Sequence, residues 1–266
     1  MNQGKIAIVT GGARGIGKAI CKRLAEDGAK VVVADVQKEL AEETSRELNA
    51  MGFETMPYTI DLSRHEEIPA MFGHVVETLG TVDVLVNNAA IQIRCPSEEF
   101  TEENWDKICD INLKAQWIAC QCAARIMLPK RSGAIVCIAS ATATRATSHR
   151  APYNITKAAV EGLARALGNE WARYGVRVNA VSPGWTGTEM VKDGLKMGII
   201  KDEEILPMMP KGRFMEPEEI ANTVNFLASD EASGIIGQTI YCDGGGSIRC
   251  IPEPDYELGV ERSSRP

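Results

Sequence analysis

Short runs of β-branched and aliphatic residues alternate along this chain with longer segments that carry apolar residues at helical spacing. The short runs predict strands at residues 6–9, 31–34, 82–86, 134–138, 176–181 and 239–242, and the longer segments predict helices, most clearly over 16–24 and 220–227. Gly28, Thr101 and Pro217 stand where helix ends need them. Strands that alternate with helices form a parallel sheet covered on both faces. The sequence therefore predicts an α/β fold with a doubly wound parallel sheet.

Residues 1–246 are predicted to form a single domain, because no Ser/Gly-rich linker or change of composition divides them. Within this domain, residues 186–215 combine glycines, prolines and methionines, which favours mobile helical pieces over a pocket. The alternative is that the methionines only fill the core. Residues 247–266 hold prolines and few apolar positions, so we expect an extended C-terminal tail.

Charge and cysteine content limit the partners of the chain. With 266 residues, a formal charge of −7 and a sequence pI near 5.2, it lacks the basic surface that nucleic acid requires. Its N-terminal apolar run, residues 6–9, is too short for a signal peptide or a membrane span, so we predict a cytoplasmic protein without membrane contact. The 8 cysteines include no CxxC pair, which favours buried reduced thiols such as Cys137 and Cys242 and gives no support for a metal site.

A glycine-rich loop follows the first predicted strand and opens the first predicted helix. It reads Thr10-Gly-Gly-Ala-Arg-Gly-Ile-Gly17. Its glycines let the backbone approach a pyrophosphate, and the helix N-terminus offers free N–H groups to that anion. Such a loop can also be a plain structural turn, so the interpretation depends on its context.

Asp35 supplies that context, because it closes the second predicted strand. A carboxylate at this place accepts hydrogen bonds from the ribose hydroxyls of NAD and repels the 2′-phosphate of NADP. Arg14, within the glycine loop, could instead support that extra phosphate. No basic residue follows Asp35 before Lys38, so NAD is favoured as the cofactor.

Tyr153 and Lys157 are four residues apart at the start of a predicted helix, so both side chains lie on one face. An ammonium beside a phenol can lower its pKa and make it a usable base. A half-buried tyrosine beside a surface lysine would give the same spacing by chance. Ser140 ends a predicted strand at the edge where α/β sheets bind ligands, and Asn112 lies on the preceding helix, which favours the catalytic interpretation.

Taken in order, these motifs resemble the classical short-chain dehydrogenase/reductase family, which has the Rossmann fold, over residues 4–246. The glycine loop is similar to the family's cofactor loop, the segment from Asn87 to Ala90 to its NNAG motif, and the segment from Pro183 to Thr188 to the part that holds the nicotinamide amide. The resemblance implies cofactor contacts at Gly11, Arg14, Gly15, Ile16, Gly17, Asp35, Asp61, Leu62, Asn88, Tyr153, Lys157, Thr186 and Thr188.

The same resemblance implies catalytic roles. Tyr153 would be the general base in oxidation and the acid in reduction, Ser140 would hold the substrate oxygen, and Lys157 would also bind the nicotinamide ribose. Asn112 would support a proton-relay water. Two residues depart from the family pattern: Ala90 replaces a glycine, which matters if a positive φ is needed there, and Thr186 replaces an isoleucine or valine.

Basic residues in the loops around the predicted site favour a small polar or anionic substrate such as a sugar acid, a hydroxy acid or a polyol. The candidate substrate residues are Arg94, Arg145, His149 and Arg150. Each of them could equally be a solvated loop residue.

The predicted activity is hydride transfer between NAD(H) and a secondary alcohol or its ketone. One alternative is an NADPH-dependent 3-oxoacyl-carrier-protein reductase, which Asp35 disfavours. Another is a non-catalytic dinucleotide sensor or scaffold, which would not need the set Asn112, Ser140, Tyr153 and Lys157. Family habit implies a homotetramer, or a homodimer.

Overall fold

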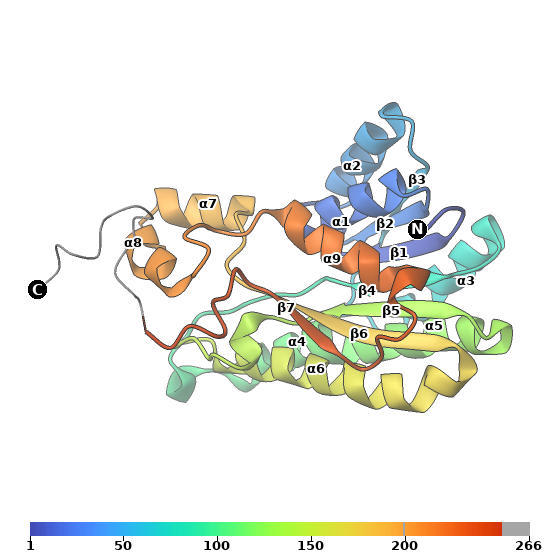
Figure 1. The fold of residues 1–266 in the computed structure, drawn as a ribbon. Coiled ribbons are helices and arrows are strands. Elements are labelled where there is room, and N and C mark those ends of the chain that lie inside the picture. Colours follow the sequence, from blue (N-terminus) through green and yellow to red (C-terminus); the bar gives the residue numbers. More distant parts are fainter. Residues whose placement is uncertain (199, 252–266) are drawn as a thin grey trace, which may run out of the picture.

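A seven-stranded parallel sheet organises residues 1–198 and 200–251, which are the residues that the structure, a computed structural model, describes. The strand order is β3-β2-β1-β4-β5-β6-β7, and every neighbouring pair is parallel (Figure 1). The strands are β1 (Ile6–Thr10), β2 (Lys30–Asp35), β3 (Thr55–Thr59), β4 (Val84–Asn87), β5 (Gly133–Ile138), β6 (Val176–Pro183) and β7 (Thr239–Cys242). The predicted doubly wound α/β fold is confirmed.

Helices cover both faces of the sheet because side chains of each strand alternate between two cores. On β1, Ile6 and Ile8 face the core under one helical layer, while Ala7 and Val9 face the other. The first layer contains α3 (Glu67–Leu79), α5 (Ala115–Lys130) and α6 (Ala151–Trp171), with α4 (Glu102–Cys109) beside them. The second contains α1 (Gly15–Glu26), α2 (Lys38–Ala50) and α9 (Pro217–Ala228).

The strand β3 was not predicted from the sequence. β3 lies at the sheet edge, carries Pro57, and has no fully buried residue among Thr55–Thr59. A half-exposed edge strand lacks the apolar run that marks buried parallel strands, and proline is tolerated only at such edges. The predicted strand 239–242 has the bounds of β7, and the other predicted strands differ from the observed ones by at most two residues at either end.

The helix ends follow the predicted chemistry. Thr101 caps α4, because its side-chain oxygen accepts a hydrogen bond from the Asn104 backbone N–H at 3.2 Å. Gly28 follows α1 with φ 90°, in the left-handed region that favours glycine, and Pro217 is the first residue of α9.

The segment 186–215 contains the short helices α7 (Glu189–Lys196) and α8 (Asp202–Ile205). Its methionines serve two purposes. Met190 and Met197 are exposed, whereas Met209 and Met215 are buried in the core beneath α9, so core filling explains only the latter pair. The mobility of this segment stays a prediction.

Ser247 begins the predicted tail, and its backbone N–H donates to Asp243 Oδ2 at 2.6 Å. Arg249 donates to the Pro207 carbonyl at 2.8 Å, which holds the chain against the 186–215 segment. The rest of the predicted extended tail, 252–266, lies outside the described residues. Among the described helices, none combines the length and the apolar character needed to cross a membrane.

Replacing Thr101 by Ala should lower the free energy of unfolding by about 1 kcal/mol, because α4 then begins with an unpaired backbone N–H. Thr101→Ser keeps the accepting oxygen and should stay close to wild type. Urea denaturation of the three proteins tests this, and equal midpoints for Ala and Ser would show that the cap contributes nothing.

Candidate active site

Two adjoining cavities, of about 880 and 750 Å³, open where the carboxyl ends of β1, β4, β5 and β6 meet. The chain order reverses between β1 and β4, and such switch points leave a crevice for ligands. We call the 880 Å³ space, lined by Ser140 and Tyr153, the larger cavity, and the other, lined by Asp35 and Asp61, the smaller cavity. They share the wall made by Arg14, Ile16, Asn88, Ala90, Thr188, Glu189 and Met190.

The glycine loop forms one end of the smaller cavity, and its geometry requires glycine. A Cβ on Gly17 would lie 1.9 Å from the Gly11 carbonyl oxygen, so no larger residue fits. Asn88 fixes the loop from β4, because its side-chain N–H₂ donates to the carbonyls of Thr10 and Gly11, each at 2.9 Å. The N-terminus of α1 is thereby held open towards the cavity, as a pyrophosphate requires.

Asp35 closes β2 at the far side of the smaller cavity. It is 8% exposed, and its carboxylate accepts hydrogen bonds from the backbone N–H groups of Ala13 and Gln37 at 3.1 and 3.0 Å. Asp61 lies on the same cavity, and hydrogen bonds from Ser63 lower the pKa of its carboxyl group. The glycine loop at one end of the smaller cavity suits the pyrophosphate of an adenine dinucleotide, and the fixed carboxylate of Asp35 at the other end suits its ribose hydroxyls.

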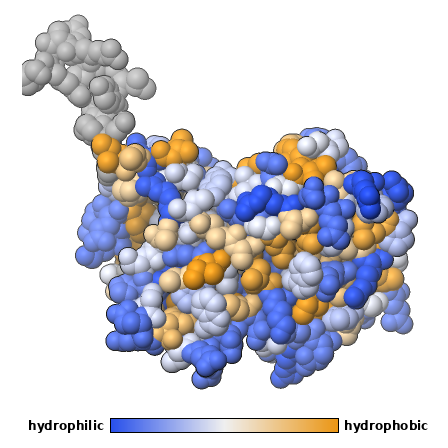
Figure 2. Space-filling view, turned by 90° about the horizontal axis from the view of Figure 1, so that it is seen from below, coloured by the Kyte–Doolittle hydropathy of each residue, from blue (hydrophilic) through white to orange (hydrophobic). Residues whose placement is uncertain are grey.

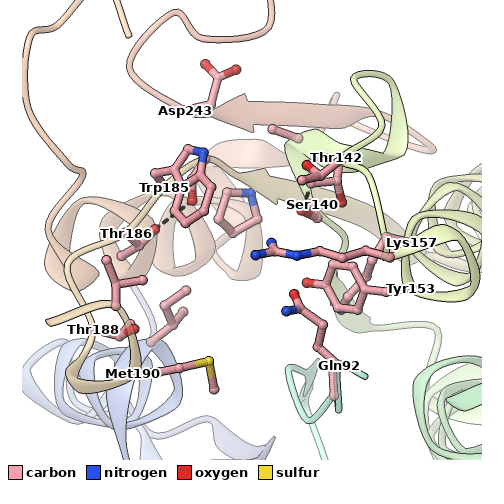
Figure 3. A pocket seen from close by; sticks show the side chains of 18 of the residues that line it. Gln92, Ser140, Thr142, Tyr153, Lys157, Trp185, Thr186, Thr188, Met190 and Asp243 are labelled. Carbon is pink, nitrogen blue, oxygen red and sulfur yellow. Dashed lines mark hydrogen bonds between the residues drawn. The ribbon is translucent and has the colours of Figure 1, made fainter. Parts of the chain in front are cut away.

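Ser140, Tyr153 and Lys157 line the same side of the larger cavity, across from Trp185, Thr186 and Thr188 (Figure 3). Ser140 follows β5, and its oxygen accepts hydrogen bonds from the Thr142 N–H at 3.2 Å and the Thr142 hydroxyl at 3.0 Å. Tyr153 and Lys157 rise from the first turns of α6, where Pro152 is accommodated without loss of a helical hydrogen bond.

Lys157 is a buried cation with one protein acceptor. It is 1% exposed, its Nζ donates to the Ile138 carbonyl at 2.7 Å, and it lies 5.6 Å from the centroid of the Tyr153 ring. Burial lowers its pKa from the ordinary 10.5 to about 8. Burial also raises the pKa of Tyr153, while the Ser140 side chain and the charge of Arg150 oppose that rise.

A family model described as enoyl-(acyl carrier protein) reductase, which belongs to the short-chain dehydrogenases/reductases, matches residues 11–247. The chain is a member of the short-chain dehydrogenase/reductase family. It is an oxidoreductase of the kind that uses a nicotinamide dinucleotide and acts on CH–OH groups.

Curated relatives within the family differ in activity. The chain is 40% identical over 249 residues to the 3-oxoacyl-[acyl-carrier-protein] reductase FabG of Staphylococcus aureus, covering 92% of this chain and 99% of the relative. It is 33% identical over 249 residues to the gluconate 5-dehydrogenase of Gluconobacter oxydans, covering 92% and 95%.

Solved structures agree with this membership. The protein gox2181 superposes with a TM-score of 0.90 at 35% identity, covering 93% of this chain and 97% of that one. A candidate 2-deoxy-D-gluconate 3-dehydrogenase from Agrobacterium tumefaciens, solved with bound NADP, gives 0.85 at 34% identity, covering 93% and 98%.

Every residue that the family resemblance assigns to the cofactor lines one of the two cavities. Ala90, which replaces a family glycine, raises no conflict: among the described non-glycine residues, only Arg131 and His149 have positive φ. Thr186 is 5% exposed and donates from its hydroxyl to the Gly184 carbonyl at 3.0 Å, so its polar atom is paired inside the segment.

Asn112 differs from the other three predicted catalytic residues, because it lines neither cavity. It is fully buried, and its carboxamide pairs with the N–H and C=O of Ile91 at 2.8 and 2.9 Å. A π-helical turn, Asp110–Lys114, places it there between α4 and α5, and such turns are frequent at functional sites. Its side chain holds the loop after β4, and its support of a water stays a prediction.

The structure separates the four candidate substrate residues. Arg94 and Arg150 line the larger cavity, and so does Arg145, whose guanidinium donates to the Gly246 carbonyl. His149 is exposed and lies outside the described linings of both cavities.

Several lining residues were missed as candidates from the sequence, among them Gln92, Trp185 and the loop of Asp243, Gly246 and Ser247. This loop follows β7, so it emerges at the same sheet edge as Ser140. The glycine run directly after a predicted strand was the available signal, because parallel strands present their carboxyl ends together.

The buried charge of Lys157 predicts a pH-dependent stability. Between pH 8 and 10.5 the unfolded chain binds the Lys157 proton more tightly than the folded protein does. The buried charge therefore destabilises the folded protein fully below pH 8, and this destabilisation disappears towards pH 10.5. The difference in free energy of unfolding between Lys157→Met and wild type should therefore fall by up to roughly 3 kcal/mol across that range. Urea denaturation at several pH values measures it, and a constant difference would contradict the buried charge.

Proposed function

We propose that this protein is an NAD-dependent dehydrogenase that interconverts a secondary alcohol and its ketone. The observation that carries the proposal is the placement of Ser140, Tyr153 and Lys157 on one wall of a cavity that adjoins the glycine loop. The two adjoining cavities can therefore hold the dinucleotide and a substrate next to each other.

In oxidation, the Ser140 hydroxyl donates a hydrogen bond to the substrate oxygen, and the Tyr153 oxygen takes the proton of the substrate hydroxyl. The bound nicotinamide supplies the hydride acceptor for oxidation, or the hydride donor for reduction. Lys157 places its charge beside the Tyr153 ring and favours the phenolate that this proton transfer needs. In reduction, Tyr153 returns the proton to the carbonyl oxygen.

Tyr153→Phe should reduce turnover by roughly 10²–10⁴-fold, because the proton acceptor is gone while the ring still fills its place. NADH binding, followed by fluorescence, should be retained. Tyr174→Phe, outside the described linings of both cavities, is the matched control. Full turnover by Tyr153→Phe would overturn the proposal. If the variant loses both NADH binding and turnover, circular dichroism shows whether it has failed to fold.

The preference for NAD rests on Asp35. A carboxylate held by two backbone N–H groups cannot turn away from a ligand, so it would repel a 2′-phosphate placed beside it. Arg14 lines both cavities and is the residue that could favour NADP. We give Asp35 the greater weight because it is fixed and 8% exposed, whereas Arg14 is exposed to solvent.

Wild type should therefore show a kcat/KM for NAD at least about tenfold above that for NADP, equivalent to about 1.4 kcal/mol. Asp35→Asn keeps the size of the side chain and removes its charge, so the ratio should fall by about tenfold. Arg14→Ala is the companion variant and should lower the NADP rate more than the NAD rate. A wild type that prefers NADP would refute the assignment.

For the substrate, we favour a small hydroxylated acid, such as a sugar acid or hydroxy acid, or a polyol. Support comes from the basic side chains on the larger cavity and from the gluconate 5-dehydrogenase relative. The lining of the larger cavity also includes Met190, Met197 and Met208, so the cavity is less polar than the loop sequences alone suggested.

A 3-oxoacyl-carrier-protein reductase is the second candidate, favoured by the 40% identity to FabG. The cofactor assay above separates the two, since the second candidate would use NADPH and a 3-oxoacyl thioester.

The homotetramer, or homodimer, implied by the family also belongs to this proposal. Figure 2 views the protein from the side of α4, α5 and α6, where hydrophobic side chains lie among hydrophilic ones. Trp105, Trp117 and Ile155 on these helices are each at least 40% exposed.

A further inference from the structure

Arg150 lies on the wall of the larger cavity and is a buried cation with no counterion among the residues that the structure describes. Its residue is 8% exposed, and its Nε has no hydrogen-bond partner. Within residues 1–198 and 200–251, no hydrogen bond or salt bridge involves its guanidinium. Leaving a buried charge unpaired is costly, so the position calls for a ligand that the described part of the chain does not provide.

Two other arginines show what a structural role looks like in this protein. The half-buried guanidinium of Arg177 donates to the carbonyls of Leu227, Ala232 and Ser229. Arg145 donates to the Gly246 carbonyl. Each of these two is paired with backbone oxygens, whereas Arg150 lines the larger cavity and its guanidinium has no such partner among the described residues.

The surroundings of Arg150 orient the guanidinium and place a second positive charge near it. Its carbon Cζ lies 5.6 Å from the ring centroid of Trp185, a cation–π distance that orients the planar group. Burial and the like charge of Arg94 both lower the pKa of Arg150. An incoming anion would relieve both effects.

Arg150 also stands directly before α6, three residues ahead of Tyr153, and its charge acts on that phenol. A group bound by Arg150 is therefore close to the reacting carbon of a substrate held by Ser140 and Tyr153. The anion must belong to the substrate itself, in a cavity that the substrate enters.

We propose that Arg150, oriented by Trp185, binds the carboxylate of the substrate through a pair of hydrogen bonds from its two Nη groups, because Nε itself is fully buried. This inference rests on the proposed dehydrogenase function and names its substrate class as a hydroxy or oxo acid. A carboxylate matches the planar fork with two parallel acceptors. A single buried guanidinium balances one negative charge, which suits a carboxylate better than a doubly charged phosphate ester.

The first test compares acids with their neutral amides in thermal shift assays with NADH present. The probes are D-gluconate with gluconamide and 3-hydroxybutyrate with 3-hydroxybutanamide. At least one acid should raise the Tm of wild type and its amide should not. Arg150→Met should abolish the shift, Arg150→Lys should restore only part of it, and Arg165→Met, exposed on α6, should keep it.

Kinetics with the same probes give the second test. Arg150→Met should raise KM for the acid by at least about tenfold more than KM for a neutral alcohol, because only the acid loses a carboxylate contact. Equal losses for acid and amide would overturn the proposal in favour of a general positioning role.

Stability of the unliganded protein gives a third test, which a structural arginine would fail. Removing an unpaired buried charge should raise the Tm of Arg150→Met by about 2–4 °C, whereas Arg177→Met should lower Tm, because it leaves three carbonyls unpaired. A lowered Tm for Arg150→Met would argue that Arg150 is structural and overturn the proposal.

These outcomes separate the two proposals. If wild type oxidises neutral alcohols with NAD and binds none of the acids, the carboxylate site is wrong and the dehydrogenase stands. If no alcohol or acid is turned over with either dinucleotide but an acid still raises Tm through Arg150, the anion site stands and the proposed reaction is wrong.

Discussion

The parallel alignment of the strands is the constraint on which this protein depends. Because all strands end at one edge, Thr10, Asn88, Ser140 and Pro183 come together although the chain separates them widely. The glycine loop then needs only one tie, from Asn88 to its carbonyls, to keep the start of α1 open. The sheet thus builds the dinucleotide site from backbone geometry, with few side chains.

Two buried cations of the site have few or no hydrogen-bond partners among the described residues. Lys157 has one carbonyl partner, and Arg150 has none among the described residues. Such groups lower the stability of the free protein, since burial favours their neutral forms. They flank Tyr153, the residue that would carry negative charge in the proposed reaction. The folded protein is therefore less stable than it could be at the place where an anion is formed or bound, which is a trade-off between stability and activity.

Much of the fold followed from the sequence, because buried parallel strands show long apolar runs that stand out against helical spacing. β3 was missed because an exposed edge strand with Pro57 has no such run. The glycine loop, Asp35 and Tyr153 were found because their chemistry is written in short motifs. The burial of Arg150 and the exposure of His149 could not be found that way, since both lie in one loop and only packing against Trp185 distinguishes them.

The loop after β7 shows how the two halves of the site can change separately. Asp243 holds it through hydrogen bonds from the N–H groups of Gly245 and Ser247, and it borders the larger cavity only. Mutations in this loop would alter which molecules enter the larger cavity without changing the residues that line the smaller cavity. Diverging enzymes built on this scaffold can therefore acquire new substrates at the end of the domain while inheriting the same redox partner from its beginning.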